Sequence, residues 1–182
     1  MGMEPDTDEE LMARAARGDE PSFRLLARRY LPRGLGLARR LIGNEAEAEE
    51  IVQEALLRVW TNAPRWRPLA PFRSWYYRIV VNLCLNHRRH PPLAPLESAG
   101  DPADPRPDPC REAEDRERDR LVAAAIGALP DRQRAAVILV YQEGLSNAET
   151  AAVLATSVSA VETLLVRART ALRRSLAALL EI

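Results

Sequence analysis

The sequence predicts an all-α protein in which two small helical domains are joined by a flexible, Pro-rich linker. Apolar residues recur at steps of three or four along most of the chain, and no convincing segment alternates apolar and polar residues as a strand does. Seven prolines lie between residues 91 and 109, where Leu93 and Leu96 are the only large apolar residues. Such a stretch cannot form a core. The 182 residues are enough for one ordinary domain or two small ones.

The first predicted domain covers residues 8–90 and begins with three amphipathic segments. The first follows Asp8, the second runs to Pro32 and the third stops at Gly43. Proline removes a helix N–H, and glycine readily adopts the left-handed backbone that ends helices. We therefore expect three separate helical segments before residue 44.

Two longer helices are predicted in the rest of this domain. Asn44 stands three residues before Glu47, which is an N-cap pattern, and the helix that follows carries an apolar face from Ala48 to Trp60. Three prolines then indicate a loop. Helix resumes near Phe72 and runs to about His90, before two further prolines.

The second predicted domain covers residues 112–182 and follows the linker 91–111. It opens with a charged helical segment that becomes apolar at Leu121. A further helix is expected to start at Pro130 and to end at Gly144.

The end of this domain has the pattern of a DNA-reading helix-turn-helix. Ser146 precedes Glu149 by three residues, a capping box that starts a short helix, and residues 155–157 break it. The longer helix that follows has a predicted buried stripe, made of Val161, Leu165, Ala168, Leu172, Leu176 and Leu179. A short helix, a three-residue turn and a longer helix form the motif that enters the major groove.

A plain helical hairpin would share this pattern, but four arginines along the second helix favour phosphate binding: Arg167, Arg169, Arg173 and Arg174. The turn is unusual in having Ala155 where glycine is generally favoured. Two alternatives stay open on the groove-facing surface. Glu162 either accepts a hydrogen bond from cytosine or caps the helix start with Ser159, and Leu164 either contacts a thymine methyl or packs.

Charge is balanced overall, with 26 basic and 26 acidic residues, but it is unevenly distributed. Residues 58–89 contain seven arginines and no acid, whereas residues 92–120 contain nine acids and five arginines. In the first of these segments aromatic side chains alternate with arginines. Rings that stack on bases and guanidinium groups that bind phosphate suit single-stranded nucleic acid. For each aromatic residue alone, packing in the core is the more usual role.

Other classes of function find no support. There is no apolar stretch long enough for a membrane span, and the acidic N-terminus is unlike a secretory signal, so we expect a cytoplasmic protein. Cys84, His87 and His90 have helical spacing but no fourth ligand, so no metal or other cofactor is expected. The sequence has no phosphate-binding glycine loop and no nucleophile motif, which argues against an enzyme.

Three motifs, in order and separated by the linker, resemble a bacterial sigma factor of the extracytoplasmic-function (ECF) group. They are AEAEEIVQEALLRVW, FRSWYYRIVVNLCLNHRR and LPDRQRAAVILVYQEGLSNAETAAVLATSVSAVETLLVRARTALRR. The resemblance covers nearly the whole chain outside the linker. It implies a transcription initiation factor that keeps only two core domains, regions 2 and 4, which corresponds to the layout predicted above.

The resemblance also implies roles for individual residues. Contact with core RNA polymerase is implied for Glu50, Gln53, Glu54 and Arg58. Recognition and melting of the promoter −10 element are implied for Arg67, Phe72, Arg73, Trp75, Arg78, Asn82, Arg88 and Arg89. Reading of the −35 duplex is implied for Ser157, Ser159, Ala160, Glu162, Thr163, Arg167, Arg169 and Arg173. At Glu162 and Leu164 the chain departs from the basic residues that are frequent in the family.

The implied partners are core RNA polymerase, promoter DNA and an anti-sigma factor, with no small-molecule substrate. Two other classes of protein share parts of this pattern. A conventional regulator would need a ligand pocket or phospho-acceptor in the first 90 residues, and neither is evident. A protein-binding helical adaptor would lack the salt-sensitive DNA affinity that phosphate contacts produce.

Overall fold

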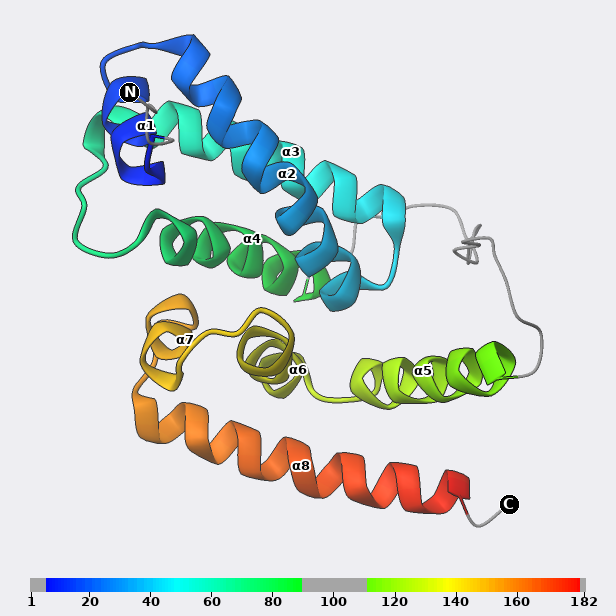
Figure 1. Ribbon diagram of the computed structural model, residues 1–182. Coiled ribbons are helices and arrows are strands. Elements are labelled where there is room, and N and C mark those ends of the chain that lie inside the picture. The colour runs from blue at the N-terminus through cyan, green and yellow to red at the C-terminus, as the bar shows by residue number, and fades with distance from the viewer. Residues whose placement is uncertain (1–5, 90–110, 181–182) are drawn as a thin grey trace, which may run out of the picture.

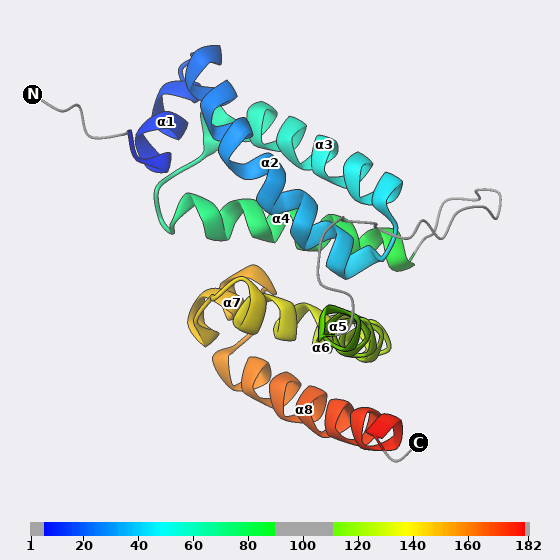
Figure 2. The same ribbon diagram turned by 45° about the vertical axis from the view of Figure 1, so that its right-hand side comes forward.

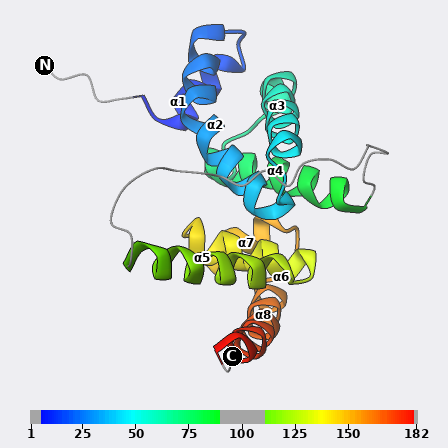
Figure 3. The same cartoon turned by 90° about the vertical axis from the view of Figure 1, so that its right-hand side faces the viewer.

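The computed structural model of the protein describes residues 6–89 and 111–180, and all of the regular structure in these ranges is helical. The predicted linker 91–111 lies almost entirely outside the described residues. The helices form two units (Figure 1). In the first, α2 and α3 lie over α4, and in the second, α5 and α6 lie between α4 and α8 (Figures 1 and 3). The all-α prediction of two helical domains is therefore confirmed.

The first unit contains α1 (Asp8–Ala15), α2 (Glu20–Ile42), α3 (Glu45–Asn62), the 3-10 turn η1 (Ala63–Arg65) and α4 (Phe72–Arg89). The prediction of a helix stop at Pro32 is wrong, because α2 continues through it. Pro32 is exposed, so water is available to the carbonyl that loses its N–H partner. Tyr30 and Leu37, on either side, are both buried, and this packing holds the helix together.

Side-chain caps fix the ends of these helices where the sequence predicts them. The Asn44 side chain accepts a hydrogen bond from the Glu47 N–H at 3.2 Å and so starts α3. Gly43, at the end of α2, has φ +81°, which is the left-handed conformation that glycine adopts without strain. At the start of α1, Thr7 and Glu10 form a complete capping box.

A cluster of aromatic rings holds α4 against α2. The Tyr30 ring lies edge-on to Phe72 and Tyr76, with centroid distances of 4.8 and 5.2 Å. Gly34 faces Tyr76 so closely that no larger residue would fit there. Offset and edge-to-face rings contribute about 0.5–1.5 kcal/mol per pair beyond their buried area. This cluster gives α4 a fixed orientation.

The second unit contains α5 (Arg111–Gly127), α6 (Asp131–Val137), a π-helical turn η2 (Ile138–Gln142), α7 (Asn147–Val153) and α8 (Val158–Leu180). Within the predicted stripe of α8, Val161, Leu165 and Ala168 are buried, whereas Leu172 and Leu176 are only partly buried and the side chain of Leu179 lies outside the described part of the chain. Within the described residues no single helix is long and apolar enough to cross a membrane, and α7 with α8 would qualify only together, across a bend of 100°.

Candidate nucleic-acid interface

A cavity of about 610 Å³ opens between the loop after η1 and the adjoining surfaces of α3 and α4. None of the described residues that line it is acidic. Pockets for small organic ligands usually measure about 300–1,000 Å³, so a nucleobase would fit. The lining consists of Arg58, Asn62, Arg65, Trp66, Arg67, Leu69, Ala70, Trp75, Arg78, Ile79 and Asn82.

The start of α4, which forms one wall of the cavity, is held by a residue far away in the sequence. The Phe72 N–H donates to the Glu9 carboxylate of α1 at 2.9 Å, which satisfies one of the free N–H groups at this helix end. The Pro71 carbonyl accepts from the Ser74 and Trp75 N–H groups at 3.0 and 3.3 Å. These hydrogen bonds hold the first turn of α4, and so one wall of the cavity, in place.

Four of the predicted −10 residues meet at this cavity. Arg67 contributes from the loop, and Trp75, Arg78 and Asn82 contribute from one side of α4. Arg58, which the sequence assigned to polymerase contact, lines the same cavity and pairs with Glu54 at 2.7 Å.

Six further lining residues were not among the predicted site residues, and three of them have polar or aromatic side chains that could bind nucleic acid. Arg65 and Trp66 belong to the basic and aromatic segment that pointed to single strands, so a signal for them was present. Asn62 lies at the end of the preceding helix, and no pattern in the sequence marks it.

The remaining basic residues of α4 lie elsewhere. Arg73 and Arg88 face the second unit, where Arg73 pairs with Glu149 at 3.6 Å and Arg88 pairs with Asp131 at 2.7 Å. Arg89, the last residue of α4, is exposed. The predicted −10 residues are thus divided between two sides of one helix.

Phe72 requires a correction. Its side chain is only 1 % exposed and packs against Tyr30 and Trp75, with ring centroids 4.8 and 5.9 Å away. In the sequence, the position of this aromatic residue next to a Pro-rich loop suggests a ring that stacks on bases. In the fold, however, the first turn of α4 points this ring into the core, so it supports the cavity from behind.

The helix-turn-helix in the second unit has the expected geometry. α7 and α8 meet at 100°, within the range of about 90–120° for this motif. The Ser146 hydroxyl accepts from the Glu149 N–H at 3.2 Å, and the Glu149 carboxylate accepts from the Ser146 N–H at 2.8 Å, so the capping box is confirmed. Ala155 has φ +48°, a conformation that usually requires glycine.

The start of α8 presents most of the predicted −35 residues to solvent. Ser157, Ser159, Glu162, Thr163 and Arg167 are exposed, as are Arg169 and Arg173 farther along, and Ala160 is partly buried. The Ser157 hydroxyl accepts from the Ala160 N–H at 3.2 Å and so caps the helix.

These contacts bear on the alternatives left open for Glu162 and Leu164. Because Ser157 is the cap, the helix start does not depend on a contact between Glu162 and Ser159, and Glu162 is exposed beside Thr163. Leu164 is partly buried and packs against the hydrophobic core. Leu164 is therefore a packing residue.

On α3, a polar surface lies opposite the buried residues Ile51, Val52 and Ala55. Three of the four predicted polymerase-contact residues are exposed on it, and Glu54 is partly buried. Leu57 is 56 % exposed in the same helix. Helical spacing accounts for this exposure, because Leu57 follows Gln53 by four residues and Glu54 by three.

Cys84 and His87 have ordinary structural surroundings. Cys84 is buried, and burial raises the pKa of its thiol to about 12. The His87 ring lies 2.9 Å from the Glu47 carboxylate. Among residues 6–89 and 111–180, no group of three or more His, Cys, Asp or Glu side chains is arranged to hold a metal ion, and His90 lies outside these ranges.

Comparison with known proteins gives consistent matches. The family described as Sigma-70 region 2 matches residues 26–90, and the one described as Sigma-70, region 4, matches residues 119–172. The ECF RNA polymerase sigma factor SigM of Mycobacterium tuberculosis is 36 % identical over 178 residues, which cover 96 % of this chain and 87 % of SigM.

Solved structures agree with these matches. The structure of CnrH in complex with the cytosolic domain of CnrY has a TM-score of 0.71 and 32 % identity, and the match covers 95 % of this chain and 99 % of CnrH. The sigma factor RpoE in complex with the anti-sigma factor NepR from Bartonella quintana has a TM-score of 0.65 over 85 % of this chain and 96 % of RpoE. At 22 % identity the second match shows the fold alone.

Proposed function

The chain belongs to the sigma-70 family, in its ECF group, and we propose that it binds core RNA polymerase, recognises promoters through their −10 and −35 elements and assists strand opening. In this proposal residues 8–90 act as region 2, residues 91–111 as a linker and residues 112–182 as region 4. Sigma factors are transcription regulators rather than enzymes, and we propose that this chain likewise supplies binding energy and catalyses no reaction.

The observation that carries the proposal is the acid-free cavity of about 610 Å³ beside α4. Moving a base out of the duplex costs a few kcal/mol, because its pairing and stacking are lost. Stacking on an aromatic side chain returns about 1–3 kcal/mol per base. Trp75 offers such a ring, Arg67 and Arg78 offer charge to the strand, and Asn82 offers an amide that can donate and accept hydrogen bonds.

We propose that α8 reads the −35 element by entering the major groove with its first turns. Ser159, Glu162 and Thr163 are exposed there, and a carboxylate in this position would accept a hydrogen bond from cytosine N4. Arg167, Arg169 and Arg173 follow along the helix and would bind phosphates, which sets the register without specifying sequence.

We propose that α3 provides the docking surface for core polymerase, through Glu50, Gln53, Glu54 and Arg58. The exposed Leu57 would add apolar area to this surface. Such a pattern, with charged residues around a small apolar centre, is usual for protein interfaces.

We also propose that a second protein, an anti-sigma factor, controls the chain in the cytoplasm, where both would meet polymerase. CnrH was solved with a partner domain described as cytosolic, and RpoE with an anti-sigma factor. The fold similarity to both complexes supports a partner of the same kind.

The test is run-off transcription with purified core polymerase and the full chain. Transcripts from defined start sites support the proposal. Duplex binding without transcription would favour a conventional regulator, and no salt-sensitive DNA binding would favour a protein adaptor.

Variants of the cavity make the test specific. Trp75→Ala and Arg78→Ala should impair promoter opening, measured by permanganate reactivity of unpaired thymines, more than they impair binding to core polymerase. Arg28→Ala, which removes an exposed arginine of α2, is the matched control. An equal loss of core binding in Trp75→Ala and Arg78→Ala would show that these residues are structural.

A further inference from the structure

The two units are packed against each other, and their contact is rich in charge. α4 and the end of α2 lie against α6, η2 and α7 (Figures 1 and 2). Three ion pairs cross the contact, and in each the arginine belongs to the first unit and the carboxylate to the second. The pairs are Arg40 with Glu143, Arg73 with Glu149, and Arg88 with Asp131.

Glu143 is the best-buried carboxylate among these. Its side chain is 12 % exposed, and both of its oxygens bind the first unit. One oxygen accepts from the Tyr77 hydroxyl at 2.5 Å, and the other accepts from the Arg40 guanidinium. Burial raises the pKa of Tyr77, and so does this hydrogen bond, so its hydroxyl remains a donor. A carboxylate satisfied on both oxygens is a strong and directional contact.

A second kind of contact, from a guanidinium to neutral carbonyl groups, accompanies the ion pairs at the end of α2. Arg134 of α6 is 4 % exposed and donates to the Leu41 carbonyl at 2.9 Å and to the Leu129 carbonyl at 3.0 Å. Burial lowers the pKa of Arg134, and the charge of Arg88 lowers it further. The Leu41 carbonyl, near the C-terminus of α2, therefore accepts from both units, since Arg88 of the first unit also donates to it, at 3.2 Å.

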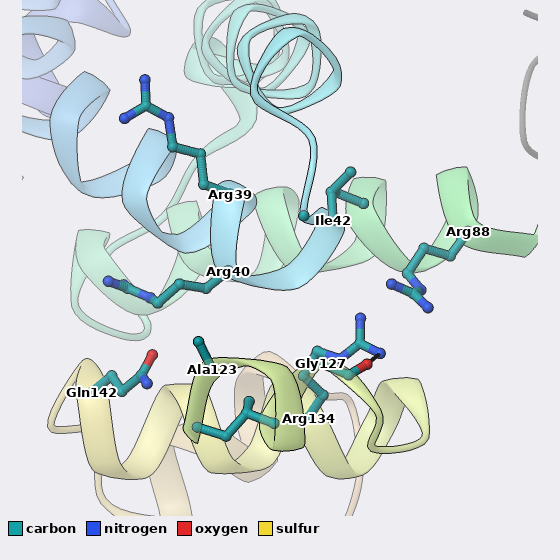
Figure 4. A pocket seen from close by; sticks show the side chains of 10 residues that line it. Arg39, Arg40, Ile42, Arg88, Ala123, Gly127, Arg134 and Gln142 are labelled. Carbon is teal, nitrogen blue, oxygen red and sulfur yellow. Dashed lines mark hydrogen bonds between the residues drawn. The ribbon is translucent and has the colours of Figure 1, made fainter. Parts of the chain in front are cut away.

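The contact also encloses a hollow. A cavity of about 500 Å³ lies between the units, with Arg40 at one end and Arg88 and Arg134 at the other (Figure 4). Ala123 and Gln142 of the second unit face it from the opposite side. The buried apolar residues of the two units belong to one cluster, so the ion pairs and the hollow accompany apolar packing between the units.

The ion pairs at the two ends of α4 involve arginines that the family resemblance assigns to the −10 element. Arg73 and Arg88 would hold the backbone of the −10 strand, and Glu149 and Asp131 already place carboxylate oxygens on them. A carboxylate and a phosphate present similar oxygens to a guanidinium, so the two would compete for the same N–H donors. The cavity beside Trp75 and Arg78, on another side of α4, is left open.

We propose that Asp131, Glu143 and Glu149 form an acidic latch that holds the two units closed and occupies Arg73 and Arg88 in place of DNA phosphates. This inference rests on the proposed function for the role of the two arginines. Core polymerase or a promoter would open the latch by binding the separated units better than the closed ones. A partner that binds the closed form would keep the factor inactive.

The expected change in DNA affinity follows from the fraction of molecules that are closed. If one molecule in about ten is open, the apparent affinity for DNA is about tenfold weaker than that of the open form. Removing the latch should therefore raise the apparent affinity for DNA about tenfold. It should also expand the free protein beyond the radius of gyration of about 16 Å that a compact chain of this length would have.

The test uses the free full-length chain with three isosteric changes, Asp131→Asn, Glu143→Gln and Glu149→Gln. Glutamine preserves the capping box at the start of α7, so the fold of the motif is kept. The control carries the same loss of charge at exposed sites away from the contact: Glu20→Gln, Glu49→Gln and Asp119→Asn. The radius of gyration is measured by X-ray scattering, and affinity by anisotropy of a short labelled single strand of mixed sequence.

We expect the latch variant to expand and to bind the strand about tenfold more tightly than the control variant. A charge swap adds a test of specificity. Glu143→Arg alone should open the protein, and adding Arg40→Glu should close it again. Three results would each contradict the proposal. They are an unchanged radius of gyration in the latch variant, an equal gain in strand affinity in the control variant, and a charge-swapped double variant that stays expanded.

Failure of the latch and failure of the proposed function are distinguishable. If the proposed function is wrong, the wild-type chain with core polymerase will give no run-off transcripts. If the latch proposal is wrong, the latch variant of the free protein will keep the radius of gyration of the wild type, a measurement that needs no polymerase.

Discussion

Substitution of Gly34 by alanine tests how the fold orients α4. Gly34 is buried in α2, and a Cβ there would overlap the hydroxyl oxygen of Tyr76 and lie 2.9 Å from its Cζ. Tyr76 is fully buried, and its ring is surrounded by Tyr30, Phe72 and Tyr77. The ring therefore has no room to move aside, and α2 and α4 must separate.

The net cost combines two opposite effects. Overpacking a core by one methyl group costs about 1–3 kcal/mol. Alanine is a better helix former than glycine by about 1 kcal/mol, which offsets part of that cost. We expect the first unit to lose up to about 2 kcal/mol, a fall in melting temperature of roughly 4–8 °C for a chain of this size.

Gly36→Ala is a matched control in the same helix. A Cβ at Gly36 would meet only the Arg40 guanidinium, at 3.7 Å, so this variant should be as stable as the wild type or more so. Thermal unfolding followed by circular dichroism measures all of these variants.

A second-site change identifies the clashing atom. The buried Tyr76 hydroxyl has no hydrogen-bond partner among the described residues, so Tyr76→Phe should cost little by itself. Combined with Gly34→Ala it should recover most of the loss. Equal stability of Gly34→Ala and Gly36→Ala, or no recovery in the double variant, would refute the packing argument.

Three further predictions concern the second unit and the buried thiol. Ala155→Gly should raise the free energy of unfolding of the second unit by about 0.5–1 kcal/mol, seen as a higher urea midpoint, because the left-handed conformation costs alanine about 1–2 kcal/mol and glycine loses roughly 0.5–1 kcal/mol of that gain in entropy. An unchanged or lower midpoint would count against strain in the turn. Arg167→Ala should weaken duplex binding about equally for all sequences and reduce the salt slope by about 1; a loss confined to one sequence would make Arg167 a base reader. In a Cys110→Ser background, Cys84 should resist Ellman's reagent at pH 8 until the protein unfolds, because a pKa of about 12 keeps the thiol protonated; rapid reaction of the folded protein would contradict its burial.

Local patterns in the sequence determined the class of the fold and the nature of its elements. The helix that starts at Asn44, the end of α2 at Gly43 and the capping box of Ser146 and Glu149 all depend on residues within four positions of one another. The acid-free, aromatic segment around α4 was also visible, because it is a property of composition.

Tertiary structure decided what local patterns cannot express. Whether α2 ends at Pro32 depends on packing on both sides of that residue, and whether Phe72 stacks on a base or fills the core depends on Tyr30, 42 positions away in the sequence. Glu9 fixes the start of α4 from 63 positions away.

The division of the α4 arginines is the clearest example. In the sequence, Arg73, Arg78 and Arg88 form one basic run, and nothing distinguishes them. In the fold, Arg78 lines the cavity, while Arg73 and Arg88 meet carboxylates from the second unit. Charge is additive along a chain, but its effect falls off with distance in space, so only the packing of the two units determines which arginines are free and which are already paired.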